Sequence, residues 1–553
     1  MRLSLVFTHC LEKVFHRQNM PPIAVENRLS GLNNEVLSWQ AVYCLQTPGN
    51  EARHELCYQL DGPLAEYISV RQVQSVPSGF PCYRETDENY LTTEPGLFPD
   101  PLMPLPQRRF FAACRYYGSL WLTLTPPADA QLAGDFPLTL RLLDAQSGEA
   151  LAEATLTLHL VPAALPPQTL LHTEWLHTDC LADYYRLAVF SPAYWRAVRN
   201  FVRCAVQAGV NMLLTPLFTP PLDTAVGGER TTVQLVRVTH SAHGYGFDFS
   251  RLAQWVALAQ EEGIEHFEIA PLFTQWGAAH APKIVVEEQG ETRTQFGWHT
   301  DAQGEAYQRF LQALLPALTA WFRDRGLERQ VWFHVSDEPT LDNLAAYRRA
   351  SAALLDGFRT FDALSDFAFY QQGLVETPVV ATDHLEPFIE HQVPGLWAYY
   401  CCVQKTEVAN RFFAQPSARN RILGVQLYLY RIAGFLHWGF NFYNSAHSRE
   451  RINPYAVTDS GHAFPSGDPF VVYPGEDLQP VESLRLRVLH QGLQDMRALQ
   501  LLESLTDRAT VEALIESELG MRITFKRYPH QAGPLLRLRD AVNRRIEALL
   551  APM

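Results

Sequence analysis

The chain has 553 residues, 47% of them hydrophobic and 19% charged, which is typical of a globular protein and enough for roughly two to four domains. Its 45 Lys and Arg residues against 59 Asp and Glu residues give a net charge of −14. This balance argues against nucleic-acid binding, because contacts to phosphates need clustered cations. A membrane partner is not expected either, since no stretch approaches the ~20 apolar residues of a membrane-spanning helix.

The cysteines and the first residues bear on the compartment. The nine cysteines include the vicinal pair Cys401–Cys402, but no CxxC motif and no zinc-ligand spacing. An odd, scattered set of this kind is typical of reduced thiols. The first residues, MRLSLVFTHCLEKVF, hold an apolar run too short for a secretory signal. We therefore expect a cytoplasmic protein with no metal and no cofactor.

Short alternating runs separated by turn-rich pieces fill the first part of the chain. Such runs predict the strands of a β-sandwich over residues 1–165. The expected strands are 36–45, 66–73, 120–125, 136–144 and 153–161. The Pro-rich stretch 161–168 reads as a linker out of this domain.

From residue 169 onward, strand-like and helix-like segments alternate. Eight strands, each followed by a crossover, predict a (β/α)8 TIM barrel over 166–480. An open doubly wound sheet is the main alternative, but no Gly-rich phosphate loop follows the early strands. The expected strands are 170–177, 210–216, 266–273, 330–336, 362–365, 378–382, 395–401 and 434–440. The expected helices between them are 192–208, 249–263, 305–325, 341–358, 366–373, 385–391 and 407–432. Further helices near 482–504, 509–519 and 533–550 predict a C-terminal extension, 481–553, that packs on the barrel.

The stretch FHVSDEPT, residues 333–340, places two adjacent carboxylates where a strand ends. In a barrel of this kind the active site lies at the C-terminal ends of the strands. The chain bends there and Pro339 cannot continue the strand, so Asp337 and Glu338 can both face the cleft. The alternative is that one of them caps the helix that starts near Leu341.

Polar and aromatic side chains follow the other predicted strands as well. Carboxylates, amides and aromatic faces around one rim suit a carbohydrate, although each residue alone also has a structural explanation. The candidates for substrate binding are Glu174, His177, Asp179, Trp276, Asp383, His384, Tyr399, Tyr400, Trp438 and Asn441. Gln275 accompanies Trp276 after the third strand.

An adjacent Asp–Glu pair favours one form of glycoside hydrolysis. In substrate-assisted hydrolysis, the 2-acetamido group of the sugar attacks the anomeric carbon. Glu338 would protonate the leaving oxygen, while Asp337 would orient the acetamido N–H. Since the charge of Asp337 disfavours ionisation of its neighbour, we expect a raised pKa for Glu338 and a charged Asp337.

Several motifs resemble the domain-of-unknown-function 4091 proteins, which are related to glycoside hydrolase family 123, the β-N-acetylgalactosaminidases. The motifs are FHVSDEP, GDPFVVYPG (467–475) and SLRLRVLHQGLQDMRALQLLE (483–503), with further pieces at 11–15, 98–105, 172–185, 215–230 and 397–402. The resemblance implies a β-sandwich followed by a catalytic barrel and retaining, acetamido-assisted hydrolysis. It implies Asp337 as the orienting residue and Glu338 as the acid/base, with Tyr400 or Tyr399 at the acetamido carbonyl.

Three other readings stay open on the sequence. A glycosidase or transglycosidase acting on a non-acetamido sugar would need a second acid such as Asp179 or Asp383. A non-catalytic carbohydrate-binding protein would bind sugar without turnover. A metal-dependent hydrolase would need His177, Asp179 and His384 to converge from separate strands. Whether the chain forms a homo-oligomer is also open.

Overall fold

The computed structural model describes residues 2–17, 27–46, 52–127, 131–275, 278–338 and 357–551. The expected substrate residue Trp276 and nearly all of the helix expected over 341–358 lie outside these ranges.

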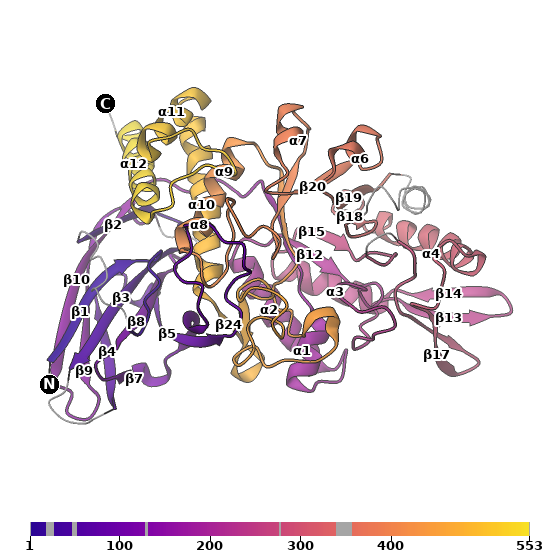
Figure 1. Ribbon diagram of the computed structural model, residues 1–553, viewed down its shortest axis with the longest axis horizontal. Coiled ribbons are helices and arrows are strands. Elements are labelled where there is room, and N and C mark those ends of the chain that lie inside the picture. Colours follow the sequence, from indigo (N-terminus) through magenta and orange to yellow (C-terminus); the bar gives the residue numbers. More distant parts are fainter. Residues whose placement is uncertain are drawn as a thin grey trace.

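Two five-stranded sheets form the N-terminal domain (Figure 1). Along β5, buried and exposed residues largely alternate, as in a strand with one face on a core. The five predicted runs each fall on a strand, and the predicted β-sandwich accounts for this part of the chain. One sheet has the order β1 (Arg2–His9), β3 (Leu37–Gln46), β8 (Tyr117–Leu124), β5 (Ile68–Ser78), β6 (Gly96–Pro104). The other has the order β2 (Arg28–Leu32), β10 (Ala150–Val161), β9 (Gly134–Asp144), β4 (Arg53–Asp61), β7 (Arg109–Ala113).

Eight parallel strands then close into a barrel, which confirms the predicted fold over the open sheet. Each strand is short and almost wholly buried, and each lies within or overlaps a predicted run. The strands are β11 (Leu171–Glu174), β12 (Met212–Thr215), β15 (His266–Ile269), β18 (Val331–His334), β19 (Arg359–Ala363), β20 (Thr377–Ala381), β21 (Trp397–Tyr399) and β22 (Gly434–His437). The pairing of β11 with β22 closes the ring.

Helices lie outside the barrel strands at most of the expected places. They are α1 (Thr178–Tyr185), α2 (Pro192–Gln207), α3 (Ser250–Glu261), α4 (Glu305–Arg323), α6 (Phe367–Gln371) and α7 (Glu386–Glu390). The single helix expected over 407–432 is wrong, because helical structure begins only with α8 (Ser417–Arg421) and α9 (Leu423–Leu429). The backbone at Pro416 is extended, and the carbonyls before it accept hydrogen bonds from the Lys13 ammonium instead of from a helix.

A four-stranded sheet is inserted between the early barrel strands. It has the order β14 (Gly244–Asp248), β13 (Arg237–Ser241), β16 (Ile284–Glu288), β17 (Glu291–Phe296). Its hairpins project from the molecule at the end opposite the sandwich (Figure 1).

Of the C-terminal helices α10 (Leu484–Leu505), α11 (Arg508–Leu519) and α12 (Ala532–Leu550), α10 lies between the sandwich and the barrel, and α11 and α12 lie at the top of the view in Figure 1. α10 packs on α8 and α9, and α12 also contacts β2 and β10 of the sandwich. The C-terminal helices contact both the sandwich and the barrel. The domain boundaries at residues 165 and 480 therefore stay predictions.

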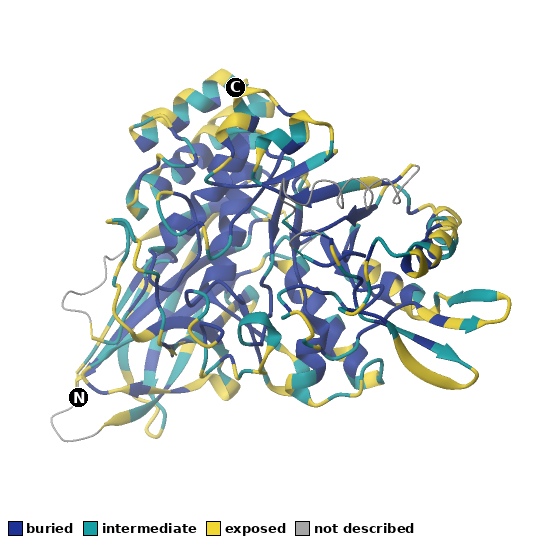
Figure 2. Cartoon of the chain, turned by 45° about the vertical axis from the view of Figure 1, so that its right-hand side comes forward, coloured by how far each residue is buried: buried dark blue, intermediate teal, exposed yellow. Residues whose placement is uncertain are grey.

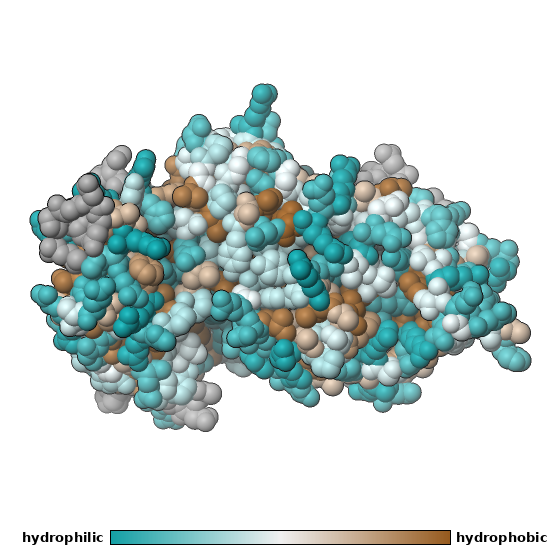
Figure 3. Space-filling view, turned by 90° about the horizontal axis from the view of Figure 1, so that it is seen from below, coloured by the Kyte–Doolittle hydropathy of each residue, from teal (hydrophilic) through white to brown (hydrophobic). Residues whose placement is uncertain are grey.

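The barrel strands and α10 form the most buried part of the molecule, while the inserted hairpins and the outer faces of α11 and α12 are exposed (Figure 2). On the face seen in Figure 3, hydrophobic side chains lie in small groups between hydrophilic ones. None of the helices in the described part of the chain is both long enough and apolar enough to cross a membrane.

Candidate active site

Asp337 and Glu338 follow β18 at the carboxyl edge of the barrel, as predicted. Asp337 is buried, with 7% of its surface exposed, and Glu338 is partly exposed. Glu338 has a φ of 50°, in the left-handed region that non-glycine residues seldom adopt. Strained backbone of this kind is concentrated at functional sites, where the surrounding structure holds it. Whether either acid caps a following helix concerns residues beyond Glu338, outside the described ranges.

Asp337 is held from two sides. The Gln275 amide donates a hydrogen bond to its Oδ2 at 2.5 Å, and the Asp223 backbone N–H in turn donates to Gln275 at 2.6 Å. His334 Nε2 lies 3.7 Å from Asp337 Oδ1. The pKa of Asp337 is raised above its usual value by burial and by the charge of Glu268, and the nearby His334 and the Gln275 hydrogen bond only partly offset that rise. The Asp337 carboxyl group is therefore fixed in orientation, and the neighbouring groups decide how readily it ionises.

Tyr399, at the end of β21, lies beside both carboxylates. Burial raises its pKa well above the usual value, and the charges of Glu338 and Asp337 raise it further. The nearby Ser365 side chain opposes this rise. The next residue, Tyr400, is fully buried elsewhere, where its hydroxyl donates to Asn420 Oδ1 at 3.3 Å. Of the two candidate tyrosines, the structure brings Tyr399 to the acids.

Beneath the acids, a few buried charged groups lie beside the mostly apolar side chains of the barrel interior. The Glu268 carboxylate accepts hydrogen bonds from Thr173 Oγ1 at 2.7 Å and from Trp175 Nε1 at 2.9 Å. His334 Nδ1 lies 3.1 Å from the same carboxylate. Asp362, at the end of β19, accepts the backbone N–H groups of Val335 and Ser336, both at 3.0 Å. These contacts fix the segment that leads into the Asp–Glu pair.

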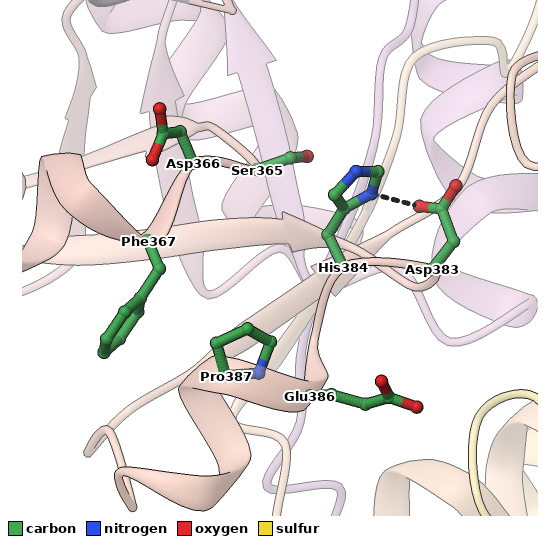
Figure 4. A pocket seen from close by; sticks show the side chains of 7 residues that line it. All are labelled: Ser365, Asp366, Phe367, Asp383, His384, Glu386 and Pro387. Carbon is green, nitrogen blue, oxygen red and sulfur yellow. Dashed lines mark hydrogen bonds and ion pairs between the residues drawn. The ribbon is translucent and has the colours of Figure 1, made fainter.

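An open groove of about 600 Å³ lies over the ends of β19 and β20 (Figure 4). Its lining includes the predicted Asp383 and His384, whose side chains are joined by a 2.7 Å hydrogen bond. Ser365, which lies near Tyr399, also lines it, so the groove adjoins that tyrosine. Asp383 and His384 are thus placed where an extended ligand could reach them.

The loop after β22 carries Trp438 and Asn441. Trp438 is partly buried, packs against Phe442 and Phe464, and donates its indole N–H to Asp468 at 3.0 Å. Burial raises the pKa of Asp468 to about 7. Trp438 is therefore an oriented aromatic face, and Asp468 orients it.

Asn441 and His177 join two of the loops that follow strands. The Asn441 amide exchanges hydrogen bonds with the backbone of His177, at 2.7 and 3.1 Å. Burial lowers the pKa of His177 to about 3, and the Arg230 guanidinium lowers it too. The neutral ring accepts from Arg230 at Nδ1 and donates to the Trp438 carbonyl from Nε2. Both residues are fully used in holding these loops together.

The other two predicted carboxylates are paired with buried arginines. Arg411 contacts both oxygens of Glu174, at 3.0 and 3.1 Å, and both side chains are inaccessible to solvent. Arg230 contacts both oxygens of Asp179 at 2.8 Å. The structure thus uses Glu174 and Asp179 to position the loops above the barrel rather than leaving them open to a ligand.

Sequence reasoning missed five residues around the site: Glu268, His334, Asp362, Arg411 and Asp468. Two of them could have been found, because His334 lies in the motif FHVSDEP, three residues before Asp337, and Asp468 lies in the motif GDPFVVYPG. Within the described ranges, no group of three or more His, Cys, Asp or Glu side chains has an arrangement that could hold a metal ion.

Comparison with solved structures gives a match over nearly the whole chain. A family 123 glycoside hydrolase from Clostridium perfringens, solved to explain glycolipid glycan hydrolysis, superposes with a TM-score of 0.70. The superposition covers 99% of this chain and 97% of that one, at 13% identity. An identity this low supports the shared fold alone.

Two β-glucuronidases match far more weakly. The Bacteroides uniformis enzyme has a TM-score of 0.30 at 10% identity, over 86% of this chain and 50% of its own. The Ruminococcus gnavus enzyme has a TM-score of 0.32 at 9% identity, over 89% and 68%. None of the curated proteins searched matches the chain in sequence.

The match to a family model, in a chain that forms the expected barrel with two acids at its carboxyl edge, identifies the class: the protein is a glycoside hydrolase. The sequence profile described as "Glycoside hydrolase 123, catalytic domain" matches residues 175–502, more than half of the chain. The chain therefore belongs to glycoside hydrolase family 123.

Proposed function

We propose that the protein is a retaining β-N-acetylhexosaminidase, of the β-N-acetylgalactosaminidase type, that uses the 2-acetamido group of its substrate as the nucleophile. Glu338 protonates the leaving glycosidic oxygen. Asp337 accepts a hydrogen bond from the acetamido N–H and stabilises the positive charge that develops as the oxazolinium ion forms. Glu338 then acts as the base that activates water.

The observation that carries this proposal is the surroundings of the adjacent pair. Asp337 is buried and held by Gln275, whereas Glu338 is partly exposed on a left-handed backbone. The charges of both carboxylates raise the pKa of Tyr399, the last residue of β21. Two acids on neighbouring parts of one sugar ring suit this geometry. The Tyr399 hydroxyl is the donor that we assign to the acetamido carbonyl.

A glycosidase for a non-acetamido sugar is the second candidate. It would need a nucleophile or base apart from the adjacent pair. Asp179 is already paired with Arg230. The second candidate function therefore depends on Asp383, which is partly exposed in the adjoining groove.

The free thiols of all nine cysteines support our further proposal that the enzyme acts in the cytoplasm, on short oligosaccharides or glycoconjugates.

The test compares aryl β-glycosides with and without the 2-acetamido group. We expect hydrolysis of aryl N-acetyl-β-galactosaminides or glucosaminides, with the β-anomer as the first product seen by proton NMR. Glu338→Gln should lose most activity on substrates with poor leaving groups and least on activated aryl glycosides. Asp337→Asn should lose about 10²-fold or more on both, since a positioned group in this role contributes that much.

The matched control is Asp383→Asn, which removes a carboxylate from the groove wall. We expect it to retain turnover of the simple aryl N-acetylhexosaminide. If instead Asp383→Asn abolishes turnover while Asp337→Asn does not, the second candidate replaces the first. Parent-like activity in both Asp337→Asn and Glu338→Gln would contradict the proposal outright.

A further inference from the structure

His334 is the last residue of β18, three positions before Asp337, and its side chain is inaccessible to solvent. Its ring lies against Trp175 and Phe361 inside the barrel. Nδ1 lies 3.1 Å from Glu268 Oε1. Nε2 lies 3.7 Å from an oxygen of Asp337 and 3.7 Å from an oxygen of Asp362. A single imidazole thus faces carboxylates from three strands or strand ends.

Glu268 fixes one side of that ring. Its carboxylate accepts hydrogen bonds from Thr173 and Trp175, neither of which can take a proton from it at ordinary pH. Because the Glu268 carboxylate acts as an acceptor, the His334 nitrogen that faces it acts as the donor. This favours an N–H on His334 Nδ1. Nε2, in contrast, has no hydrogen-bond partner among the described residues, although it is completely buried. The side of the ring that faces Asp337 is therefore not anchored by a hydrogen bond, and its contact with Asp337 is one of charge.

We propose that His334 is a positioning residue that, held by Glu268, supplies the positive charge that keeps Asp337 ionised inside the barrel. This inference rests on the proposed function, in which Asp337 must accept a hydrogen bond from the acetamido N–H. A protonated Asp337 would lack the charge that stabilises an oxazolinium ion.

The electrostatic balance supports this role. Glu268, Asp337 and Asp362 bring up to three negative charges around one cation. Burial alone lowers the pKa of His334, but the hydrogen bond with Glu268 and the charges of Asp362, Asp337 and Glu268 raise it to about 9. The imidazole is therefore charged at neutral pH. By the same interaction, His334 opposes the rise that burial imposes on the pKa of Asp337.

A neutral replacement should shift the titration of Asp337 in a known direction. In His334→Gln the side-chain amide can still donate to Glu268, but the charge is lost. The pKa of Asp337 should then rise, by about one unit for the loss of an opposite charge at this distance. Activity that needs ionised Asp337 will accordingly fail at a higher pH than in the parent.

The kinetic test measures kcat/KM against pH with an activated aryl N-acetyl-β-galactosaminide, for which protonation by Glu338 matters least. We expect the acid limb of His334→Gln to move up by about one pH unit. The control is His490→Gln, which removes another buried histidine, on α10 near Gly209, well away from the acids. Its acid limb should match the parent. A folded His334→Gln variant with an unmoved acid limb overturns the proposal.

A second measurement does not need turnover. In protein labelled with ¹³C at histidine Cε1, the resonance absent from His334→Gln identifies His334. We expect it to titrate near pH 9 in the parent and about one unit lower in Asp337→Asn. A midpoint at or below 6.5, or no change in Asp337→Asn, contradicts the charge pairing. If aryl N-acetylhexosaminides are not hydrolysed at all, the proposed function fails, while this titration still decides the pairing.

Discussion

Two adjacent tyrosines at the end of β21 have opposite surroundings. Neighbouring residues of a strand point to opposite faces, so Tyr399 faces the barrel axis and the acids, while Tyr400 faces outward. Tyr400 packs against Phe435 and His437 and is fully buried. The pair therefore offers the same chemical change at two places, one at the site and one in the core.

Replacing Tyr399 with Phe should lower kcat/KM about 10- to 100-fold on N-acetylhexosaminides, because one hydrogen-bond donor to a charge-bearing group is lost. The free energy of unfolding should stay close to that of the parent. Tyr400→Phe is the control. It should keep its activity and lose about 1 kcal/mol of stability, the value of one hydrogen bond. Equal loss of activity in the two variants would contradict the assignment of Tyr399.

The segment before α8 is the element that differs most from expectation. This segment forms a loop, in which the Lys13 ammonium group donates hydrogen bonds to the backbone carbonyls. Arg411, which belongs to the same loop, pairs with Glu174 at the end of β11. Arg411 donates to Glu174, to His437 Nδ1 at 2.6 Å and to the Gly439 carbonyl at 2.8 Å. The loop thus links the ends of β11 and β22, where the barrel closes.

Arg411→Met should destabilise the protein by about 3–5 kcal/mol, since it leaves Glu174 charged and buried without its partner. The double variant with Glu174→Gln should recover part of that loss, because the unpaired charge is removed. Denaturant unfolding measures both. Arg309→Met removes an arginine from an exposed pair on α4 and should cost no more than about 0.5 kcal/mol. A similar small effect for Arg411→Met would show that the network does not hold this loop.

At the level of elements, the barrel was predictable because its strands are short apolar runs that end in polar residues. The inserted sheet was not, because a strand such as β13 buries one residue in five and lacks a clear pattern. The Asp–Glu pair was found from adjacency along the chain. Arg411 could not be found in this way, since its partner Glu174 is 237 residues distant in sequence. His334 stood in the motif, but its surroundings come from β15 and β19.

The whole molecule is joined by charged side chains buried between the sandwich and the rest. Asp100 on β6 is inaccessible and contacts Arg485 on α10 through both oxygens, at 2.7 and 2.9 Å. Lys13 is also buried, and burial lowers its pKa to about 7. Such groups lose their partners if the sandwich opens away from the barrel, so the two domains stabilise each other.

We therefore expect a single unfolding transition in calorimetry, with no separate transition for the sandwich. Asp100→Asn should lower the midpoint of that whole transition, corresponding to about 3–5 kcal/mol, because Arg485 is left buried and unpaired. Asp61→Asn, at an exposed pair on β4, should leave it nearly unchanged. Two resolved transitions in the parent would contradict this coupling.

The contact between Lys13 and the loop before α8 has a consequence for biosynthesis. Its two sides are about 400 residues apart in the chain. At ribosomal rates of roughly 5–20 residues per second, the N-terminal side waits on the order of 20–80 s for its partner. The ammonium group of Lys13, which is buried in the folded protein, stays hydrated during that interval. Arg411 pairs with Glu174 only after the ribosome has reached this part of the chain. The part of the barrel where β11 and β22 meet is thus completed late in translation, and an interrupted polypeptide carries Glu174 without the arginine that pairs with it.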